Sequence, residues 1–217
     1  MIDNYEKLEN GLIKQKSFLF EKKEYTEKYV KTYNSLGELS VRMSFLRLGF
    51  LFGAIQEKIT KLLDVGYGNG DFLNCAKDFV AHPCGNEING YHIPDGCEFV
   101  SDIFCSPNGL FSMCEKFDVV CFFDVLEHFD DIYEIENIKT KYMFISVPEC
   151  HYYSDEWFKD WKHRKPDEHL WHFNKESLRC FMKEIGYELV VYSDIEDTIR
   201  KSESKESNIL TGIFIKN

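Results

Sequence analysis

The sequence lacks the features of several protein classes. No apolar run approaches the roughly 20 residues that cross a membrane, and the first residues do not show the pattern of a signal peptide. The eight cysteines never occur as Cys-x-x-Cys, and several lie inside apolar runs. We therefore expect reduced cysteines in a core rather than a zinc site or a set of disulfides. These absences favour a cytoplasmic protein.

An excess of positive charge is also absent. The chain carries 26 Lys and Arg against 37 Asp and Glu, which gives a formal net charge of −11. Binding to nucleic acid usually needs a basic surface. We therefore expect a small-molecule substrate and no nucleic acid or membrane partner, while the choice between a monomer and a homodimer stays open.

The most informative stretch is an apolar strand that runs into three glycines and then into a helix, within residues 61–79. Its glycines are Gly66, Gly68 and Gly70. Glycine lets the backbone turn sharply and approach a ligand, and the start of the following helix presents unpaired N–H groups. The pattern predicts a ligand-binding turn in an α/β domain, for which 217 residues are sufficient.

The glycine spacing, with Asp64 two residues before the first glycine, resembles the first motif of class I S-adenosylmethionine-dependent methyltransferases. The resemblance runs from about residue 61 to the C-terminus. It implies S-adenosylmethionine as the cofactor and S-adenosylhomocysteine as the product, with the acid near the amino-acid part of the cofactor and the glycines passing under it. The implied cofactor-binding residues of this motif are Asp64, Gly66, Tyr67, Gly68 and Gly70.

Two later positions extend this match. Glu87 follows the predicted second strand, and a carboxylate there can accept hydrogen bonds from both ribose hydroxyls. Asp102 and Ile103 follow the third strand, where the resemblance implies that the acid takes the adenine amino group and the apolar residue packs on the ring. A solvated loop acid at 87 and a strand-end turn acid at 102 are the alternatives.

The fourth strand ends at Asp124-Val-Leu-Glu-His128. This run resembles the one in ubiquinone-type O-methyltransferases, where it is associated with a divalent metal. We expect Asp124 to bind the cofactor, His128 to act as a general base and Glu127 to orient it. A metal is possible but not favoured, because adjacent Glu and His cannot face the same way on a regular helix. A structural Glu-His pair that anchors the turn is the third option.

Residues 149–173 are rich in His, Trp and Tyr and follow the fifth strand, so we interpret them as a substrate cap. The predicted substrate-binding residues are His163, Arg164, His169 and His172. The basic cluster Lys162, Arg164 and Lys165 favours an anionic group such as phosphate or carboxylate. A polar network that ties the cap to the sheet is the alternative for the last two histidines.

Residues 1–60 are predicted to form a helical lid, with one or two surface helices in 1–34 and an apolar helix over 40–55. On the second helix, Arg42 and Arg47 either extend to the surface or reach the cofactor carboxylate or an anionic substrate. Residues 61–217 are predicted to form the methyltransferase domain. The expected fold is α/β and Rossmann-like, with a seven-stranded, mostly parallel sheet, an antiparallel last strand and helices on both faces.

The function that follows is O- or N-methylation of a small molecule, with an anionic sugar or nucleotide derivative as one option. Methylation of a macromolecule is disfavoured, because the run after the fourth strand is not of the Asn-Pro-Pro-Tyr type. The remaining alternative is a non-catalytic or dinucleotide-binding Rossmann-like module used for interaction or assembly.

Overall fold

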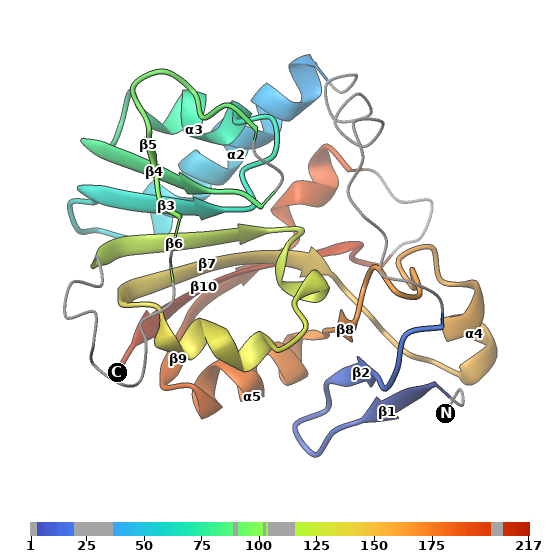
Figure 1. The fold of residues 1–217 in the computed structure, drawn as a ribbon. Helices are drawn as coiled ribbons and strands as arrows, with labels where there is room; N and C mark the ends of the chain where they lie inside the picture. The colour runs from blue at the N-terminus through green and yellow to red at the C-terminus, as the bar shows by residue number, and fades with distance from the viewer. Residues whose placement is uncertain (1–3, 20–36, 89–90, 102, 104–115, 201–205) are drawn as a thin grey trace.

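The computed structural model describes residues 4–19, 37–88, 91–101, 103, 116–200 and 206–217. A seven-stranded sheet in the order β5-β4-β3-β6-β7-β10-β9 forms the centre of the molecule (Figure 1). The neighbouring strands β5, β4, β3, β6 and β7 are parallel to one another, and β10 is antiparallel to both of its neighbours, β7 and β9. This arrangement confirms the predicted fold. The strands are β3 (Lys61–Val65), β4 (His82–Asn86), β5 (Glu98–Phe99), β6 (Phe117–Phe123), β7 (Thr140–Pro148), β9 (Tyr187–Ser193) and β10 (Ile209–Lys216).

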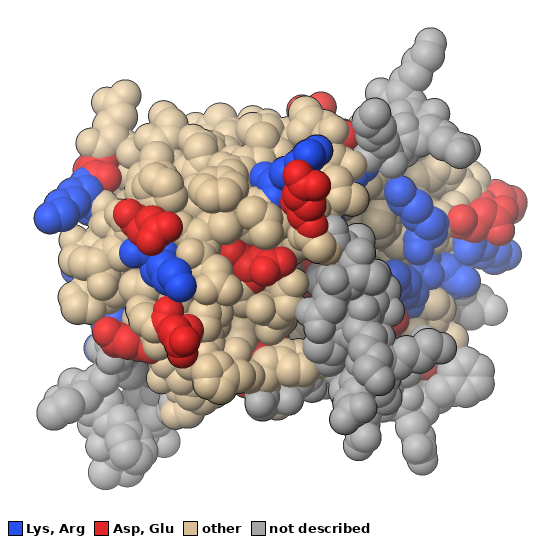
Figure 2. All heavy atoms as spheres, turned by 90° about the horizontal axis from the view of Figure 1, so that it is seen from above, with Lys and Arg blue, Asp and Glu red and all other residues tan. Residues whose placement is uncertain are grey.

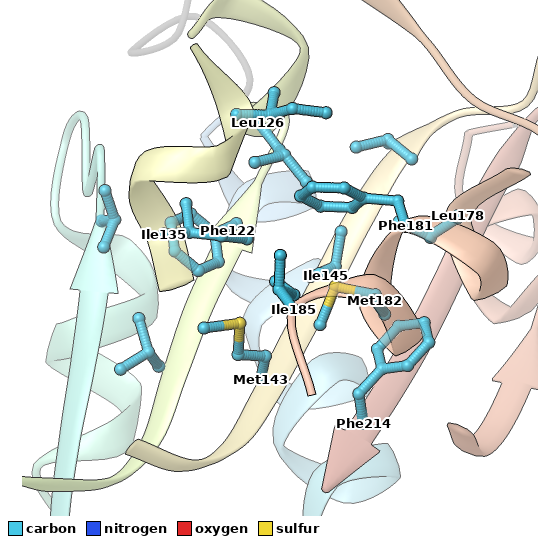
Figure 3. Close-up of a cluster of buried hydrophobic side chains, with 14 of the residues drawn as sticks. Phe122, Leu126, Ile135, Met143, Ile145, Leu178, Phe181, Met182, Ile185 and Phe214 are labelled. Carbon is cyan, nitrogen blue, oxygen red and sulfur yellow. The ribbon is translucent and has the colours of Figure 1, made fainter. Parts of the chain in front are cut away.

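Side chains that alternate along the strands build a core on each face of the sheet. Leu62 and Phe144 belong to the core under α2 (Glu38–Ala54) and α3 (Asp71–Ala76). Their neighbours Leu63 and Ile145 belong to the opposite core, which includes α5 (Lys175–Glu184) and the 3-10 helix η2 (Ile132–Asn137). Figure 3 shows this second core, in which side chains of β6 and β7 meet those of α5.

Helix α5 has a local sequence signal at each end. The Asn174 side chain accepts a hydrogen bond from Ser177 N at 2.8 Å, and Ser177 Oγ accepts one from Asn174 N at 2.9 Å. This reciprocal arrangement satisfies N–H groups that the helix itself leaves unpaired. Gly186 follows the helix with φ of 84°, a conformation that glycine adopts without strain.

The N-terminal prediction is wrong for residues 5–15, which form a hairpin instead of a helix. Strands β1 (Tyr5–Lys7) and β2 (Ile13–Gln15) are antiparallel, and β2 also pairs with β8 (Trp171–His172). The apolar residues Leu8 and Leu12 have helical spacing. Pairing of Ile13 with His172, which is far away in sequence, overrides that local signal. The helix expected over 40–55 is confirmed as α2. The rest of the expected helical segment, at 20–34, lies outside the described residues, and a lid role stays a prediction.

The predicted cap follows the carboxyl end of β7. It contains α4 (Asp155–Asp160) and β8, and its last residue, Phe173, forms a bridge with Glu149. Figure 1 shows α4, β8 and the β1–β2 hairpin together at the end of the sheet toward which β6 and β7 point. The cap and the hairpin therefore flank the edge at which ligands bind in open α/β sheets.

Seen from above, the surface carries charges of both signs. In Figure 2, most of the surface is tan, a few basic and acidic side chains lie at the left and near the centre, and several Lys and Arg side chains with acidic ones beside them lie at the right. None of the helices in the described part of the chain is long and apolar enough to cross a membrane.

Candidate functional site

The three glycines form a turn with left-handed backbone at each of them, with φ of 70° at Gly66, 54° at Gly68 and 78° at Gly70. A Cβ atom on Gly66 would lie 2.6 Å from Cγ2 of Val125, which follows β6. Glycine is therefore required at 66 for two reasons, the backbone conformation and the close approach of the neighbouring strand end. The turn lies against the end of β6, next to the predicted catalytic run.

Glu87 is joined to this turn. Its Oε2 accepts a hydrogen bond from Gly68 N at 3.0 Å, and the side chain is buried. The Tyr67 side chain points away from this contact and belongs to the core against Gly85, where an added Cβ would lie 2.6 Å from its ring. Of the predicted adenine-binding pair, Ile103 is buried at 8% exposure and Asp102 lies outside the described residues.

Asp64 lies at the carboxyl end of β3 and is 3% exposed. Burial raises the pKa of this carboxyl to about 8; the charge of Arg47 acts in the opposite direction, and the charge of Glu87 adds to the rise. Since burial disfavours the charged form of a carboxyl, Asp64 prefers its neutral form at pH 7. A cationic ligand group at this position would favour the ionised form.

A buried network of ions lies beside the turn, and the sequence did not reveal it. Arg47 on α2 forms two hydrogen bonds with Glu196, at 2.7 and 3.0 Å, and lies 3.7 Å from Asp124. Arg200 binds both carboxylate oxygens of Asp124 and approaches Glu196 at 3.4 Å. Ser146 also donates to Glu196, at 2.6 Å. This set of partners stabilises two charges of each sign inside the protein.

Asp124 is therefore held by arginines rather than exposed to a ligand. Burial by itself would raise its pKa, but Arg200 and Arg47 hold the pKa below its usual value, so the group is ionised. Its φ of 56° is unusual for a residue other than glycine. Arg42, by contrast, pairs with Glu38 on the exposed face of α2, so Arg47 is the arginine that reaches the site.

Glu127 and His128 lie on a single 3-10 turn, η1 (Leu126–His128). Adjacent residues can direct their side chains to one site only from such an irregular turn, not from a regular α-helix. Together with His169 of the cap they offer three ligand atoms within 4.8 Å of one another. Neither carboxylate oxygen of Glu127 has a hydrogen-bond partner on another residue in the part of the chain that the structure describes. Burial and the nearby charge of Asp124 raise the pKa of Glu127 well above its usual value, so a cationic group beside it would favour the ionised form.

The cap holds this group of three in place through backbone contacts. His128 Nδ1 donates to the Glu168 carbonyl oxygen at 2.7 Å, and Leu170 N donates to the Glu127 carbonyl oxygen at 2.8 Å. Because Nδ1 carries the proton, Nε2 of His128 keeps its lone pair. Burial lowers the pKa of His128, and it lowers the pKa of His169 to about 2, with His128 contributing. Both imidazoles are therefore neutral.

The other two predicted substrate histidines, His163 and His172, both pack against the Trp161 ring, at 5.5 and 5.6 Å. His172 is 3% exposed and also contacts the rings of Tyr5 and Phe158. His163 shares a hydrogen bond of 2.9 Å with Asn208. His169 is the cap histidine whose ring nitrogen lies within 4.8 Å of ligand atoms of Glu127 and His128.

Two side chains of the basic cluster predicted for an anionic substrate contact other residues. Arg164 lies over the Tyr5 ring at 5.9 Å, and Lys165 pairs with Glu168 at 2.9 Å. Recognition of phosphate usually brings several cationic groups to one point, and these two side chains have other partners. An anionic acceptor stays a prediction.

Two of the functional residues could not be found from motifs. Arg200 lies in a charged segment after β9, and Glu196 lies in the 3-10 helix η3 (Ile195–Thr198). Neither position has a sequence signature, since their role depends on the approach of α2 to the end of β6. For His169, the cluster of histidines in the cap was a signal, although it did not indicate which one faces Glu127.

Comparisons with known proteins identify the family and the fold. A family model described as "Methyltransferase domain" matches residues 16–192, which is most of the chain. Among curated proteins, none matches.

Solved structures share the fold at low sequence identity. An S-adenosylmethionine-dependent methyltransferase from Clostridium acetobutylicum has a TM-score of 0.58 at 10% identity, covering 88% of this chain and 98% of that one. A chain in the complex of the Haloferax volcanii Trm112 methyltransferase activator with a methyltransferase has a TM-score of 0.58 at 12% identity, covering 88% and 94%. Magnesium protoporphyrin IX methyltransferase from Synechocystis, with bound S-adenosylhomocysteine, has a TM-score of 0.52 at 11% identity, covering 82% and 86%.

Proposed function

This chain belongs to the methyltransferase-domain family, and we propose that it binds S-adenosylmethionine at the glycine turn and transfers the methyl group to a small-molecule acceptor. The observation that carries the proposal is the hydrogen bond between Gly68 N and Glu87, which places the glycine turn of residues 66–70 beside a buried carboxylate. That arrangement suits a ribose and an amino-acid tail lying across the carboxyl ends of the strands. Solved proteins of the same fold contain S-adenosylhomocysteine or S-adenosylmethionine.

The buried acids give the cofactor two points of attachment. Glu87 can accept hydrogen bonds from the ribose hydroxyls while it retains Gly68 N. Asp64 lies where the resemblance places the amino-acid part, and its carboxyl becomes a favourable partner for an ammonium group once it ionises. The methyl of a sulfonium is already activated, so orientation of the two reactants supplies most of the acceleration.

The residues near His128 fit a divalent metal, which the ubiquinone-type resemblance implies. The candidate ligands are Glu127, His128 and His169, one carboxylate oxygen and two imidazole nitrogens. This donor set suits Mn²⁺, Fe²⁺ or Zn²⁺. When bound, such a metal would polarise an acceptor hydroxyl and favour loss of its proton. Asp124, although part of the same run, is held by Arg200 and does not belong to the ligand set.

Without a metal, His128 is the candidate general base. Its Nδ1–H is fixed on the Glu168 carbonyl oxygen, so Nε2 can accept a proton from an acceptor O–H or N–H group. The two roles exclude each other, because both use the lone pair of Nε2. A test of metal binding therefore also bears on the role of this histidine.

The cofactor is tested by calorimetric titration with S-adenosylmethionine and S-adenosylhomocysteine. We expect binding that Glu87→Gln weakens by about tenfold or more, since a buried hydrogen-bonded charge is lost. Glu188→Gln is the matched control, because it removes the same charge from an exposed position on β9. Tight binding of NAD without binding of S-adenosylhomocysteine would favour the dinucleotide-binding alternative and contradict the proposal.

The metal is tested on protein treated with a chelator, by titration with Mn²⁺ and Zn²⁺ and by the shift in melting temperature. We expect a stoichiometric effect that His169→Ala and Glu127→Gln remove. His82→Ala is the control, because His82 lies at the start of β4, at the other end of the strand from Glu87. Equal metal response in all variants would contradict the metal site and leave general base catalysis and a structural Glu-His pair as the two roles of His128.

A further inference from the structure

The cap contains an open hollow that none of the candidate cofactor or metal ligands in the described part of the chain lines. The residues after β7, helix α4 and the residues before β10 surround this hollow of about 390 Å³. This volume is sufficient for a small organic molecule. The hollow is separate from Glu127, His128 and His169, none of which lines it.

Aromatic rings form a continuous wall of this hollow. His151 and Tyr153 are stacked at 5.7 Å with an angle of 7° between their planes, and Tyr153 meets Trp157 edge to face at 5.3 Å. Trp157 in turn stacks on Trp161 at 5.5 Å. Tyr153 is 60% exposed, and such exposure of a large aromatic side chain often marks a binding surface.

Acidic side chains outnumber basic ones in the described lining. Its charged residues are Glu149, Asp160, Glu206 and Lys162, and Ser207 and Asn208 add uncharged polar groups. Glu149 accepts a hydrogen bond from Ser207 and is 5% exposed, so its position is fixed. Glu206 Oε2 lies 3.6 Å from Nδ1 of His151, which joins the acidic and the aromatic parts of the lining.

We propose that this hollow binds an organic cation, a quaternary or protonated amine on a small body. Aromatic faces attract cations through the ring quadrupole, with Trp the strongest, and nearby carboxylates add to that attraction. The same carboxylates repel phosphate and carboxylate ligands. The proposal therefore opposes the anionic substrate that the basic residues of the cap suggested from sequence.

The hollow is connected to the strand ends by hydrogen bonds. Asn208 lines it, shares a hydrogen bond of 2.9 Å with His163, and donates to the Arg200 carbonyl oxygen at 3.4 Å. Arg200 binds Asp124 at the end of β6. Cation binding in this hollow is independent of methyl transfer. A role of the hollow in holding the amine end of a methyl acceptor rests on the proposed function.

The test uses choline as the probe and 3,3-dimethylbutan-1-ol as its uncharged counterpart of the same shape. Trp157 and Trp161 line the hollow, while Trp171 is buried elsewhere, so tryptophan fluorescence reports on the site. We expect saturable quenching by choline below about 50 mM, and binding of the alcohol weaker by about fivefold or more. Inorganic phosphate should not compete.

Variants separate the aromatic and the acidic contributions. Glu206→Gln should weaken choline binding by about threefold or more, and Trp157→Phe should weaken it while the fold, followed by circular dichroism, is kept. Glu188→Gln on β9 is the matched control and should bind choline as the native protein does. Equal binding of choline and the alcohol, absence of saturation, or competition by phosphate would each overturn the proposal.

A parallel titration with S-adenosylhomocysteine separates this proposal from the methyltransferase proposal. Choline binding without S-adenosylhomocysteine binding supports the cation site and contradicts the proposed function. Binding of S-adenosylhomocysteine alone contradicts the cation site and leaves the proposed function in place.

Discussion

Binding of S-adenosylhomocysteine should become tighter as the pH rises, because of Asp64. The pKa of this buried carboxyl is about 8 in the empty protein. If the cofactor ammonium group needs the carboxylate, only about one molecule in ten is competent at pH 7 and about one in two at pH 8. The apparent dissociation constant should then fall about fivefold between these two values and level off above pH 9.

The assay is calorimetric titration of native protein and of Asp64→Asn between pH 6.5 and 9. The amino group of the ligand titrates in a similar range, so the measure is the difference between the two proteins. Native protein should also release a proton on binding, seen as a binding enthalpy that depends on the ionisation heat of the buffer. An identical pH dependence in both proteins would refute the role of Asp64.

The same pKa predicts a change in the stability of the protein without cofactor. The groups that face Asp64 are Arg47 from α2, Glu87 after β4 and the buried thiol of Cys121 in β6. Because the pKa is raised on folding, the folded state binds more protons than the unfolded state between about pH 4 and about pH 8. The free energy of unfolding should therefore fall as the pH rises through this range, and Asp64→Asn should reduce the slope in urea denaturation.

Three further substitutions test the turn, the core and a helix cap. Gly66→Ala should lower cofactor affinity by about tenfold or more, because a Cβ meets Val125, and adding Val125→Ala should restore part of it. Phe181→Ala, at a fully buried position, should lower the free energy of unfolding by about 3–5 kcal/mol in urea denaturation. Asn174→Ala should cost about 1 kcal/mol in the same assay, and Asn174→Asp should cost much less.

Features that depend on local sequence were predicted correctly. The apolar runs of β3, β6 and β7 specify buried parallel strands whatever surrounds them, and the glycines specify the turn through backbone conformation. The cap of α5 is likewise a local signal, since Asn174 and Ser177 satisfy each other within one turn. That the sheet has seven strands, mostly parallel and with an antiparallel last strand, followed from the resemblance.

Features that depend on contacts between distant segments were not predicted. The β1–β2 hairpin owes its strand conformation in part to β8, and the spacing of its apolar residues fits a helix equally well. The buried ion network needs α2, η3 and the end of β6 together, so Arg200 gave no signal in the sequence. An acidic and a basic residue far apart in sequence become partners only when packing excludes water from both.

The position of Asp124 explains why the acid-x-x-Glu-His run must be divided between two tasks. Asp124 already accepts from both nitrogens of Arg200, so it can contact a cofactor amine or a metal only if that arginine moves away. Glu127 and His128 lie close to His169, and backbone hydrogen bonds with residues 168–170 hold them there. The first acid of the run thus stabilises the packing of α2 against the strand ends, while the Glu-His pair depends on the cap. A change in the cap should therefore alter acceptor chemistry and metal binding while cofactor affinity, which depends on the glycine turn, Asp64 and Glu87, is retained.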